Sequence, residues 1–227
     1  MIKCNVTIIG TISRNGESRT DKEGRPYSTF GIQSVIKAKS GINKTIDISV
    51  SKDGHLDTSM NFSIGKRIKI DGILTFRKRD ETIYYNLSAK NIDFNVQSED
   101  SINGTITFRG TTGSKDIAEK ESKKGNYRIF DAYSSEKTDE NNYTYIWVHF
   151  VDFSSERPAF LQPKVGIDAE GVLELTIYNG KENFGCLVKT ISKWDKQSSN
   201  GLVLWQKRVI MPMDFPLLIK LLKSSRN

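Results

Sequence analysis

The side chains best suited to bind a ligand are aromatic rings and clustered basic residues. The segment YTYIWVHFVDF, residues 143–153, carries aromatic rings at alternate positions, and RKR at 77–79 is a run of basic residues. Further arginines lie between residues 14 and 25. Aromatic faces stack on planar partners, while basic surfaces attract polyanions. Both kinds of chemistry are non-covalent, and they favour a binding protein.

Residues suited to catalysis or metal binding are sparse. The chain has no phosphate-binding loop, zinc motif or nucleophile elbow, and it has only 2 histidines. Cys4 and Cys186 stand at no metal-ligand spacing, which predicts reduced, structural thiols. Asp131 with Asp152 is not a convincing acidic pair for a metal-dependent nuclease. We therefore expect no enzyme, no metal and no cofactor.

The segments that carry these residues occur twice. YSTFGIQS at 27–34 returns as YRIFDAYS at 127–134, with its Tyr, Phe and final Ser in the same places. The same offset superimposes the apolar alternation of other segments, namely 6–10 on 106–110 and 46–50 on 146–150. Near the end of each unit the offset slips by one residue, as one loop deletion would make it. We interpret the chain as an internal duplication.

The duplication predicts two domains and a tail. The domains are expected at 1–97 and 102–194, separated by the polar seam NVQSEDSING, and the tail at 195–227. Residues 1–97 hold 16 basic and 10 acidic side chains, residues 98–194 hold 12 and 15, and the tail holds 6 and 2. The first domain and the tail are therefore basic. Such a surface attracts polyanions, although it also serves ordinary solubility.

Each unit shows strand periodicity bounded by Gly, Asn, Asp and Pro clusters. The predicted strands are 5–12, 26–36, 43–51, 66–77 and 82–94, then 103–110, 126–134, 142–152, 166–178 and 183–193. Room for a short helix exists only between the third and fourth strand of each unit, in DGHLDTSMNFSIG and SSERPAFLQPKVG. Five strands with one such helix indicate an OB-fold, a small, partly open β-barrel. We expect an all-β protein made of two tandem OB-folds.

The motifs of the first unit follow a recognisable order: IIGTIS, TFGIQSV, KTIDISVS, then GKRIKIDGILTFR from Gly65. This order resembles the bacterial and phage single-stranded DNA-binding proteins. The resemblance implies sequence-tolerant binding of single-stranded DNA and its protection in replication or recombination. The family's acidic tail tip is missing, since the chain ends LLKSSRN. With the divergence and a Lys/Ile/Asn-rich composition, this points to a phage or mobile-element gene.

Other expectations concern assembly and location. The family usually builds a tetramer from one OB-fold per chain, so two per chain imply a monomer or a homodimer. No leader opens the chain and no apolar run is long enough to cross a bilayer, which predicts a cytoplasmic protein without membrane contact, in the host cell if phage-encoded. In the tail, Asp214 caps a short helix begun by Pro216. This helix packs on a barrel, dimerises, or docks replication and recombination proteins.

The register of the second unit turns its aromatic rings outward. Because positions 146, 148 and 150 align with the apolar set at 46, 48 and 50, Tyr145 and Trp147 must lie on the opposite face, with Tyr133 beside them. An OB-fold binds its ligand on this face, where bases stack on rings. Tyr27 and Tyr127 are further candidate contacts. The alternative is that the tail or a second subunit covers the rings, and Asp131 on the same face counts against DNA.

Basic residues of the first unit flank the equivalent face. The candidates for phosphate contact are Arg14, Arg19 and Arg25 between strands one and two, and Arg77, Lys78 and Arg79 with the edge residue Tyr84 between strands four and five. The alternative for 77–79 is a solvated hairpin tip.

Two other functions stay open. The second domain is a module for dimerisation or protein docking, or the chain binds RNA, as OB-folds also do.

Overall fold

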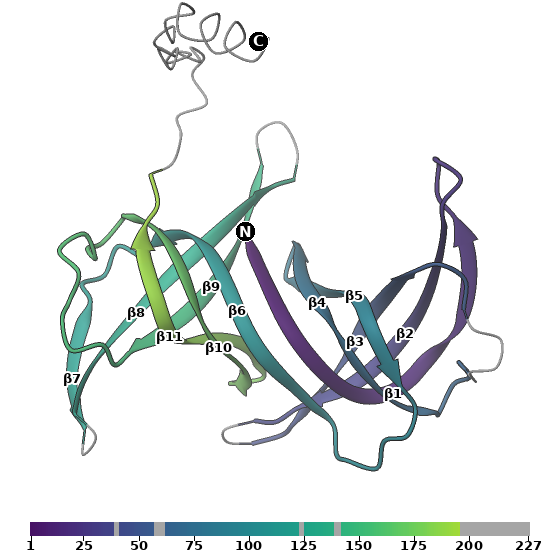
Figure 1. Ribbon diagram of the computed structural model, residues 1–227. Coiled ribbons are helices and arrows are strands. Elements are labelled where there is room, and N and C mark those ends of the chain that lie inside the picture. Colours follow the sequence, from purple (N-terminus) through teal and green to yellow (C-terminus); the bar gives the residue numbers. More distant parts are fainter. Residues whose placement is uncertain (39–40, 57–61, 123–124, 139–141, 196–227) are drawn as a thin grey trace, which may run out of the picture. The chain divides into compact units, whose positions relative to one another are not determined.

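The computed structural model describes residues 1–38, 41–56, 62–122, 125–138 and 142–195, and Figure 1 shows it. The first unit contains β1 (Ile2–Thr20), β2 (Pro26–Ile36), β3 (Lys44–Asp53), β4 (Arg67–Arg79) and β5 (Thr82–Asp93). The second contains β6 (Ser101–Thr112), β7 (Ala118–Ser122), β8 (Gly125–Lys137), β9 (Tyr143–Asp152), β10 (Gly166–Tyr178) and β11 (Lys181–Lys193).

Each unit closes into a barrel. In the first, β1 pairs with both β2 and β4, β2 pairs with β3, and β3 runs parallel to β5. In the second, β6 pairs with β8 and β10, and β9 runs parallel to β11. An antiparallel barrel closed by one parallel pair between its third and fifth strands is the OB topology. The predicted pair of tandem OB-folds is confirmed.

The short helix predicted between the third and fourth strands is wrong for the second unit. Residues 153–165 form turns and bends, and the described part of the chain contains no helix. Pro158 and Pro163 remove two backbone donors from this segment, while the Leu161 N–H donates to the Pro158 carbonyl in a single tight turn. In the first unit the predicted helix includes residues 57–61, which lie outside the described residues. The helix predicted in the tail also lies outside them. Strand β7 was not predicted, because AEKES shows no apolar alternation.

The predicted cores are confirmed by burial. Phe30 and Phe130, the fixed points of the repeated phrase, are 0% and 5% exposed. Ile48 of β3 and Val148 of β9 are also buried, while Trp147 between two inward positions is exposed. The alternation therefore sets one face of each third strand against the core and leaves the other for a partner.

Two glycines mark equivalent close approaches in the two barrels. A β-carbon at Gly10 would overlap the carbonyl oxygen of Gln33, and one at Gly110 would overlap that of Tyr133. The two pairs are related by the offset of 100 residues. First and second strands can cross this tightly only where a side chain is missing.

The barrels are joined through their first strands. β1 and β6 form an antiparallel ladder from Ile2 opposite Phe108 to Ile9 opposite Ser101, and Figure 1 shows purple β1 beside teal β6. Asn5 pairs with Thr105, its own equivalent in the repeat. A ladder centred on equivalent residues is the pattern of a two-fold symmetric contact. Residues 1–195 form one compact unit.

Substituting Gly10→Ala or Gly110→Ala is expected to lower the free energy of unfolding by about 1–3 kcal/mol, because the added methyl group forces two strands apart. Denaturant unfolding measures the change. Asn5→Ala, exposed on β1, serves as control and is expected to stay within about 0.5 kcal/mol of the unsubstituted protein. Equal stability of the glycine variants and the control would contradict the close approach.

Candidate nucleic-acid interface

Three rings gather on the outer face of β8 and β9. Tyr133 lies opposite Trp147 in the ladder, and their ring centroids are 5.0 Å apart. The Tyr145 ring meets Tyr133 edge-on at 5.5 Å. Trp147 is 52% exposed and Tyr145 is 47% exposed. We call Tyr133, Tyr145 and Trp147 the aromatic platform, and the prediction that they face outward together is confirmed by their burial and contacts.

The break between β6 and β7 lies beside Trp147, at the edge of the platform. In the first unit β1 continues to Thr20 along β2, whereas β6 stops at Thr112 and pairing resumes only in β7. Gly113 follows the break, and its N–H donates to the carbonyl of Asp131 at 2.7 Å. A β-carbon on Gly113 would come 3.4 Å from the Trp147 ring. The indole therefore rests against backbone on this side.

Tyr143 extends the same row of rings. It is 53% exposed, and it stands two residues before Tyr145 on the same face of β9. Sequence reasoning did not name it as a contact, although the alternation that identified Tyr145 and Trp147 also covers it.

The basic hairpin consists of Arg77, Lys78 and Arg79 at the end of β4. Tyr84 on β5 is paired with Arg77 across the ladder and is 50% exposed. Asp80, at the turn, has a φ of 52°. Lys78 lies 4.0 Å from Glu81, an exposed partner that screens its charge little.

The structure brings the basic hairpin and the aromatic platform to one groove. The groove holds about 850 Å³, and its walls include all three hairpin residues together with Tyr145 and Trp147. Its remaining charged residues are Asp80, Glu136 and Lys137, so cations outnumber anions. The groove lies between β4 of one barrel and β9 of the other. The sequence left open whether the barrels share a site, and this geometry was not predicted.

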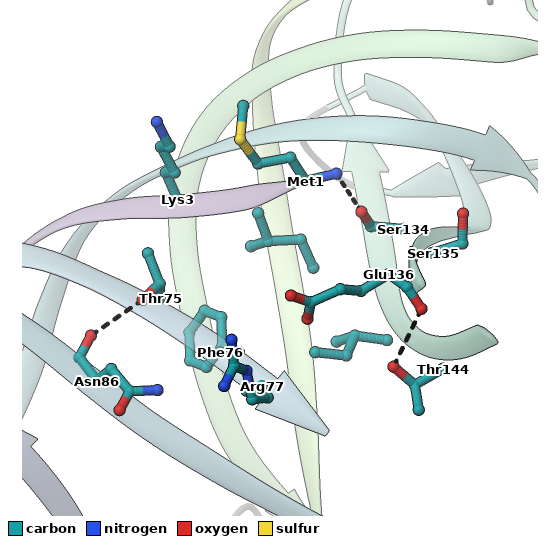
Figure 2. Close-up of a pocket in the computed structure, with 12 residues that line it drawn as sticks. Met1, Lys3, Thr75, Phe76, Arg77, Asn86, Ser134, Ser135, Glu136 and Thr144 are labelled. Carbon is teal, nitrogen blue, oxygen red and sulfur yellow. Dashed lines mark hydrogen bonds between the residues drawn. The ribbon is translucent and has the colours of Figure 1, made fainter. Parts of the chain in front are cut away.

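A second hollow, whose lining residues Figure 2 shows, shares residues with the groove. It holds about 500 Å³ and shares Arg77, Glu136 and Thr144 with the groove. Arg77 comes from β4 and Glu136 from β8, so both barrels contribute to it. The Thr144 hydroxyl donates to the Glu136 carbonyl at 3.5 Å. Asn86 and Lys3 add polar groups on the side of the first barrel.

Two of the predicted loop arginines lie on the same path. Arg14 and Arg19 line a hollow of about 420 Å³ that also includes Asn86, the residue shared with the hollow of Figure 2. Arg14 donates to the carbonyl of Phe30 at 3.3 Å. Arg19 donates to Glu17 at 2.8 Å on the exposed surface. The three hollows therefore adjoin one another: Asn86 lines the first and the second, and Arg77 lines the second and the groove beside Trp147.

Arg25 does not line any of these three hollows. Its guanidinium donates to Asp21 at 2.8 Å and also pairs with Glu23, within the turn that precedes β2. The Arg25 backbone N–H and then its side chain hold the pKa of Asp21 below its usual value. Tyr27 lies opposite Arg19 in the β1–β2 ladder, and Tyr127 stacks on Phe153. Neither tyrosine is among the residues that line the groove.

The symmetry mate of the groove is bridged by contacts between described residues of the two barrels. The counterpart of the groove lies where the β10–β11 hairpin meets the β2–β3 hairpin. There Ile177 forms a bridge with Ala38, and Lys44 donates to Glu182 at 2.8 Å. These contacts between described residues bridge the position that corresponds to the groove.

Five of the described residues with acidic, imidazole or thiol groups are paired or buried. Asp152 accepts from Arg128 at 2.9 Å in the interior, and Asp131 lies 2.8 Å from His149 Nδ1. Burial raises the pKa of both Cys4 and Cys186 to about 12, so these thiols stay protonated and unreactive at neutral pH. The described residues include no helix long and apolar enough to cross a membrane.

Comparison with known proteins gives structural likeness alone. No family model and no curated protein sequence matches the chain. Among solved structures, the wild-type single-stranded DNA binding protein from Thermus aquaticus is 13% identical, with a TM-score of 0.44, over 89% of this chain and 97% of that one. A small single-stranded DNA-binding protein from Streptomyces coelicolor is 17% identical (TM-score 0.32; 42% of this chain, 94% of that one). The N-terminal domain of PriB from Thermoanaerobacter tencongensis is 22% identical (TM-score 0.29; 41% and 98%).

The buried Arg128–Asp152 pair is expected to anchor the end of β9. Arg128 also donates to the carbonyls of Ser154 and Glu156, at 2.6 and 3.1 Å. Arg128→Met should lower the free energy of unfolding by about 3–5 kcal/mol, because it leaves Asp152 buried without its counter-charge. Arg109→Met, which breaks the more exposed pair with Asp168, should cost about 1 kcal/mol or less. Equal losses in denaturant unfolding would show that Arg128 is no anchor.

Proposed function

We propose that the chain binds single-stranded DNA without sequence preference, in the groove between the basic hairpin and the aromatic platform. The observation that carries the proposal is that these two surfaces line one groove. Rings accept unpaired bases of any kind, because every base has a flat π-face. Cations neutralise phosphates irrespective of sequence. A duplex hides its base faces in the stack, so the platform favours single strands.

The two barrels have different roles in this proposal. The first supplies Arg14, Arg19, Arg77, Lys78 and Arg79 to the phosphate backbone. The second supplies the platform to the bases. The outer positions of β3, Thr45, Asp47 and Ser49, offer no ring, which supports this division. A strand bound in this way contacts both barrels at once.

The finer parts of the function follow from the sequence features described above. We propose that binding protects exposed strands during replication or recombination, in a phage or mobile-element context in the host cytoplasm. The tail, residues 195–227, is the segment that would recruit replication or recombination proteins. The working assembly is a monomer or a homodimer.

A protein interface is the second candidate function of the platform. The observation that favours it is the size of the exposed aromatic surface, since Tyr143, Tyr145 and Trp147 are each about half exposed. Asp131 lies on the same face as the platform, but it is not among the residues that line the groove. The basic hairpin across the groove favours a polyanion over an apolar partner.

Oligo-dT is expected to quench the tryptophan fluorescence of the unsubstituted protein, and duplex DNA is not. Trp147→Ala should weaken oligo-dT binding about 5- to 150-fold, because one stacking surface is lost. Fluorescence anisotropy of a labelled oligomer measures the affinity of this variant independently of the indole. Unchanged affinity would move the site away from the platform, and absence of oligo-dT binding would leave the platform as a protein interface. Competition with an RNA oligomer of equal length separates DNA from RNA binding.

Removing two cations from the hairpin should change the salt dependence of binding. The double substitution of Arg77→Gln with Arg79→Gln is expected to reduce the slope of log K against log salt by about 1.4, because two phosphate contacts are lost. Arg25→Gln is the matched control and should leave the slope unchanged, since Arg25 is held by Asp21. If Arg25→Gln lowers the slope as much as the hairpin variant does, the cations act only through net charge.

A further inference from the structure

The hollow of Figure 2 contains a carboxylate that binding of a polyanion does not explain. Glu136 of β8 lines both this hollow and the groove. In Figure 2 its carboxylate points away from Thr144, toward the side of the hollow that carries Phe76 and Arg77. A carboxylate repels phosphates, so it weakens a site that holds only the backbone of a nucleic acid. Its position favours a partner that donates hydrogen bonds and has no negative charge.

No described residue donates a hydrogen bond to this carboxylate. The Thr144 hydroxyl donates to the backbone carbonyl of Glu136, at 3.5 Å. Lys78, which also lines the groove, lies 4.0 Å from Glu81. Arg77 lines the same hollow, but it forms no ion pair with Glu136 in the described part of the chain. The carboxylate is therefore available to accept hydrogen bonds from a ligand in the hollow.

The first barrel has an apolar residue at the equivalent position. Ile36 corresponds to Glu136 at the offset that relates the two units, and it is 3% exposed. Two more positions differ in the same way between the bridged side of the boundary and the groove side, the last of them after the one-residue slip of the offset. On the bridged side they are Ile36, Ala38 and Ile177, and on the groove side Glu136, Thr138 and Lys78. Packing between the barrels is thus achieved by apolar residues, and it does not require a carboxylate.

The hollow has the size and the lining of a site for one base. Its volume of about 500 Å³ lies within the range typical of ligand pockets. Ile2, Phe76 and Ile146 give it apolar surface, and Glu136 adds a charged acceptor. An ionised carboxylate can accept two parallel hydrogen bonds. Among the DNA bases only guanine has two adjacent donors, N1–H and the N2 amino group, on its Watson–Crick edge.

We propose that the hollow of Figure 2 selects guanine at one position of the bound strand, and that Glu136 is the residue that reads the base. This selection rests on the proposed binding of single-stranded DNA and adds a preference at one nucleotide to it. Glu136 accepts hydrogen bonds from N1–H and the N2 amino group, while Arg77 contacts the phosphate of the same nucleotide. Adenine and cytosine place a ring acceptor against one carboxylate oxygen. Thymine has a single N–H donor between two carbonyl groups.

The test measures, by fluorescence anisotropy, how labelled oligomers bind to the full chain. Each oligomer is oligo-dT of about 8 nucleotides, within the site size of an OB-fold, either unchanged or with dG, dA, dC or deoxyinosine at one central position. The oligomer with dG should bind at least about fivefold more tightly than the others that have a natural base there. Deoxyinosine lacks the N2 amino group, so it should lose most of this advantage.

Two variants remove the carboxylate. Glu136→Gln replaces one acceptor oxygen by a donor, and it should reduce the preference for dG to less than about twofold. Glu136→Ile, which matches position 36 of the first barrel, should have the same effect. Both variants should bind unchanged oligo-dT more tightly, because a negative charge is lost. Glu170→Gln, at an exposed residue of β10 that lines none of the three hollows, removes the same charge and should keep the preference for dG.

The other outcomes have distinct meanings. If the Glu136 variants bind every oligomer more tightly by the same factor and dG keeps its advantage, Glu136 acts through charge alone and the proposal is wrong. Equal binding of the dG and deoxyinosine oligomers would also contradict it, because the N2 amino group would then not be read. If oligo-dT binds but dG gives no advantage, the guanine site is wrong and the proposed function stands. If no oligomer binds, the proposed function itself is wrong.

Discussion

The antiparallel ladder between β1 and β6 is the interaction on which the candidate site depends. It pairs backbone with backbone from Ile2 to Ile9, so its geometry leaves little freedom for the barrels to shift along each other. This pairing carries the β4–β5 hairpin of one barrel to β9 of the other. Either barrel by itself holds half of the proposed binding surface: cations without a stacking platform, or rings with fewer cations.

The two repeats keep similar residues at buried positions and differ at exposed ones. Inward positions keep the same character, as Phe30 and Phe130 show, because a closed core accepts little change in volume. Outward positions of the third strands face no such limit. There the serine at position 49 corresponds to the histidine at 149, and Asp47 corresponds to Trp147. The two barrels thus share one fold but have different side chains on their outer faces.

The alternation of apolar and polar residues predicted the strands of each barrel well, but it did not predict the groove between the barrels. Alternation identified ten of the strands and the outward register of Trp147, because period-two burial is a local property. The shared groove depends on pairing between residues about a hundred positions apart, for which no local signal exists. Arg25 was predicted as a contact because its type fits, but an ion pair within its own loop holds it elsewhere. Tyr143, which extends the exposed row of rings, was not named, although the alternation that identified Trp147 also covers it.

The bridged mate of the groove has a consequence for the proposed ligand. A dimer of identical barrels would have two equivalent crossings, and a strand could enter either one with the same outcome. Here Lys44 and Glu182 bridge one of them, so the described residues leave one crossing without such a bridge, from the arginines of the first barrel to the rings of the second. That crossing has unlike ends, and a nucleic acid strand also has unlike ends. Under the proposed function, one orientation of the strand would be preferred at one place on the molecule, whereas a symmetric pair would offer the same preference at two.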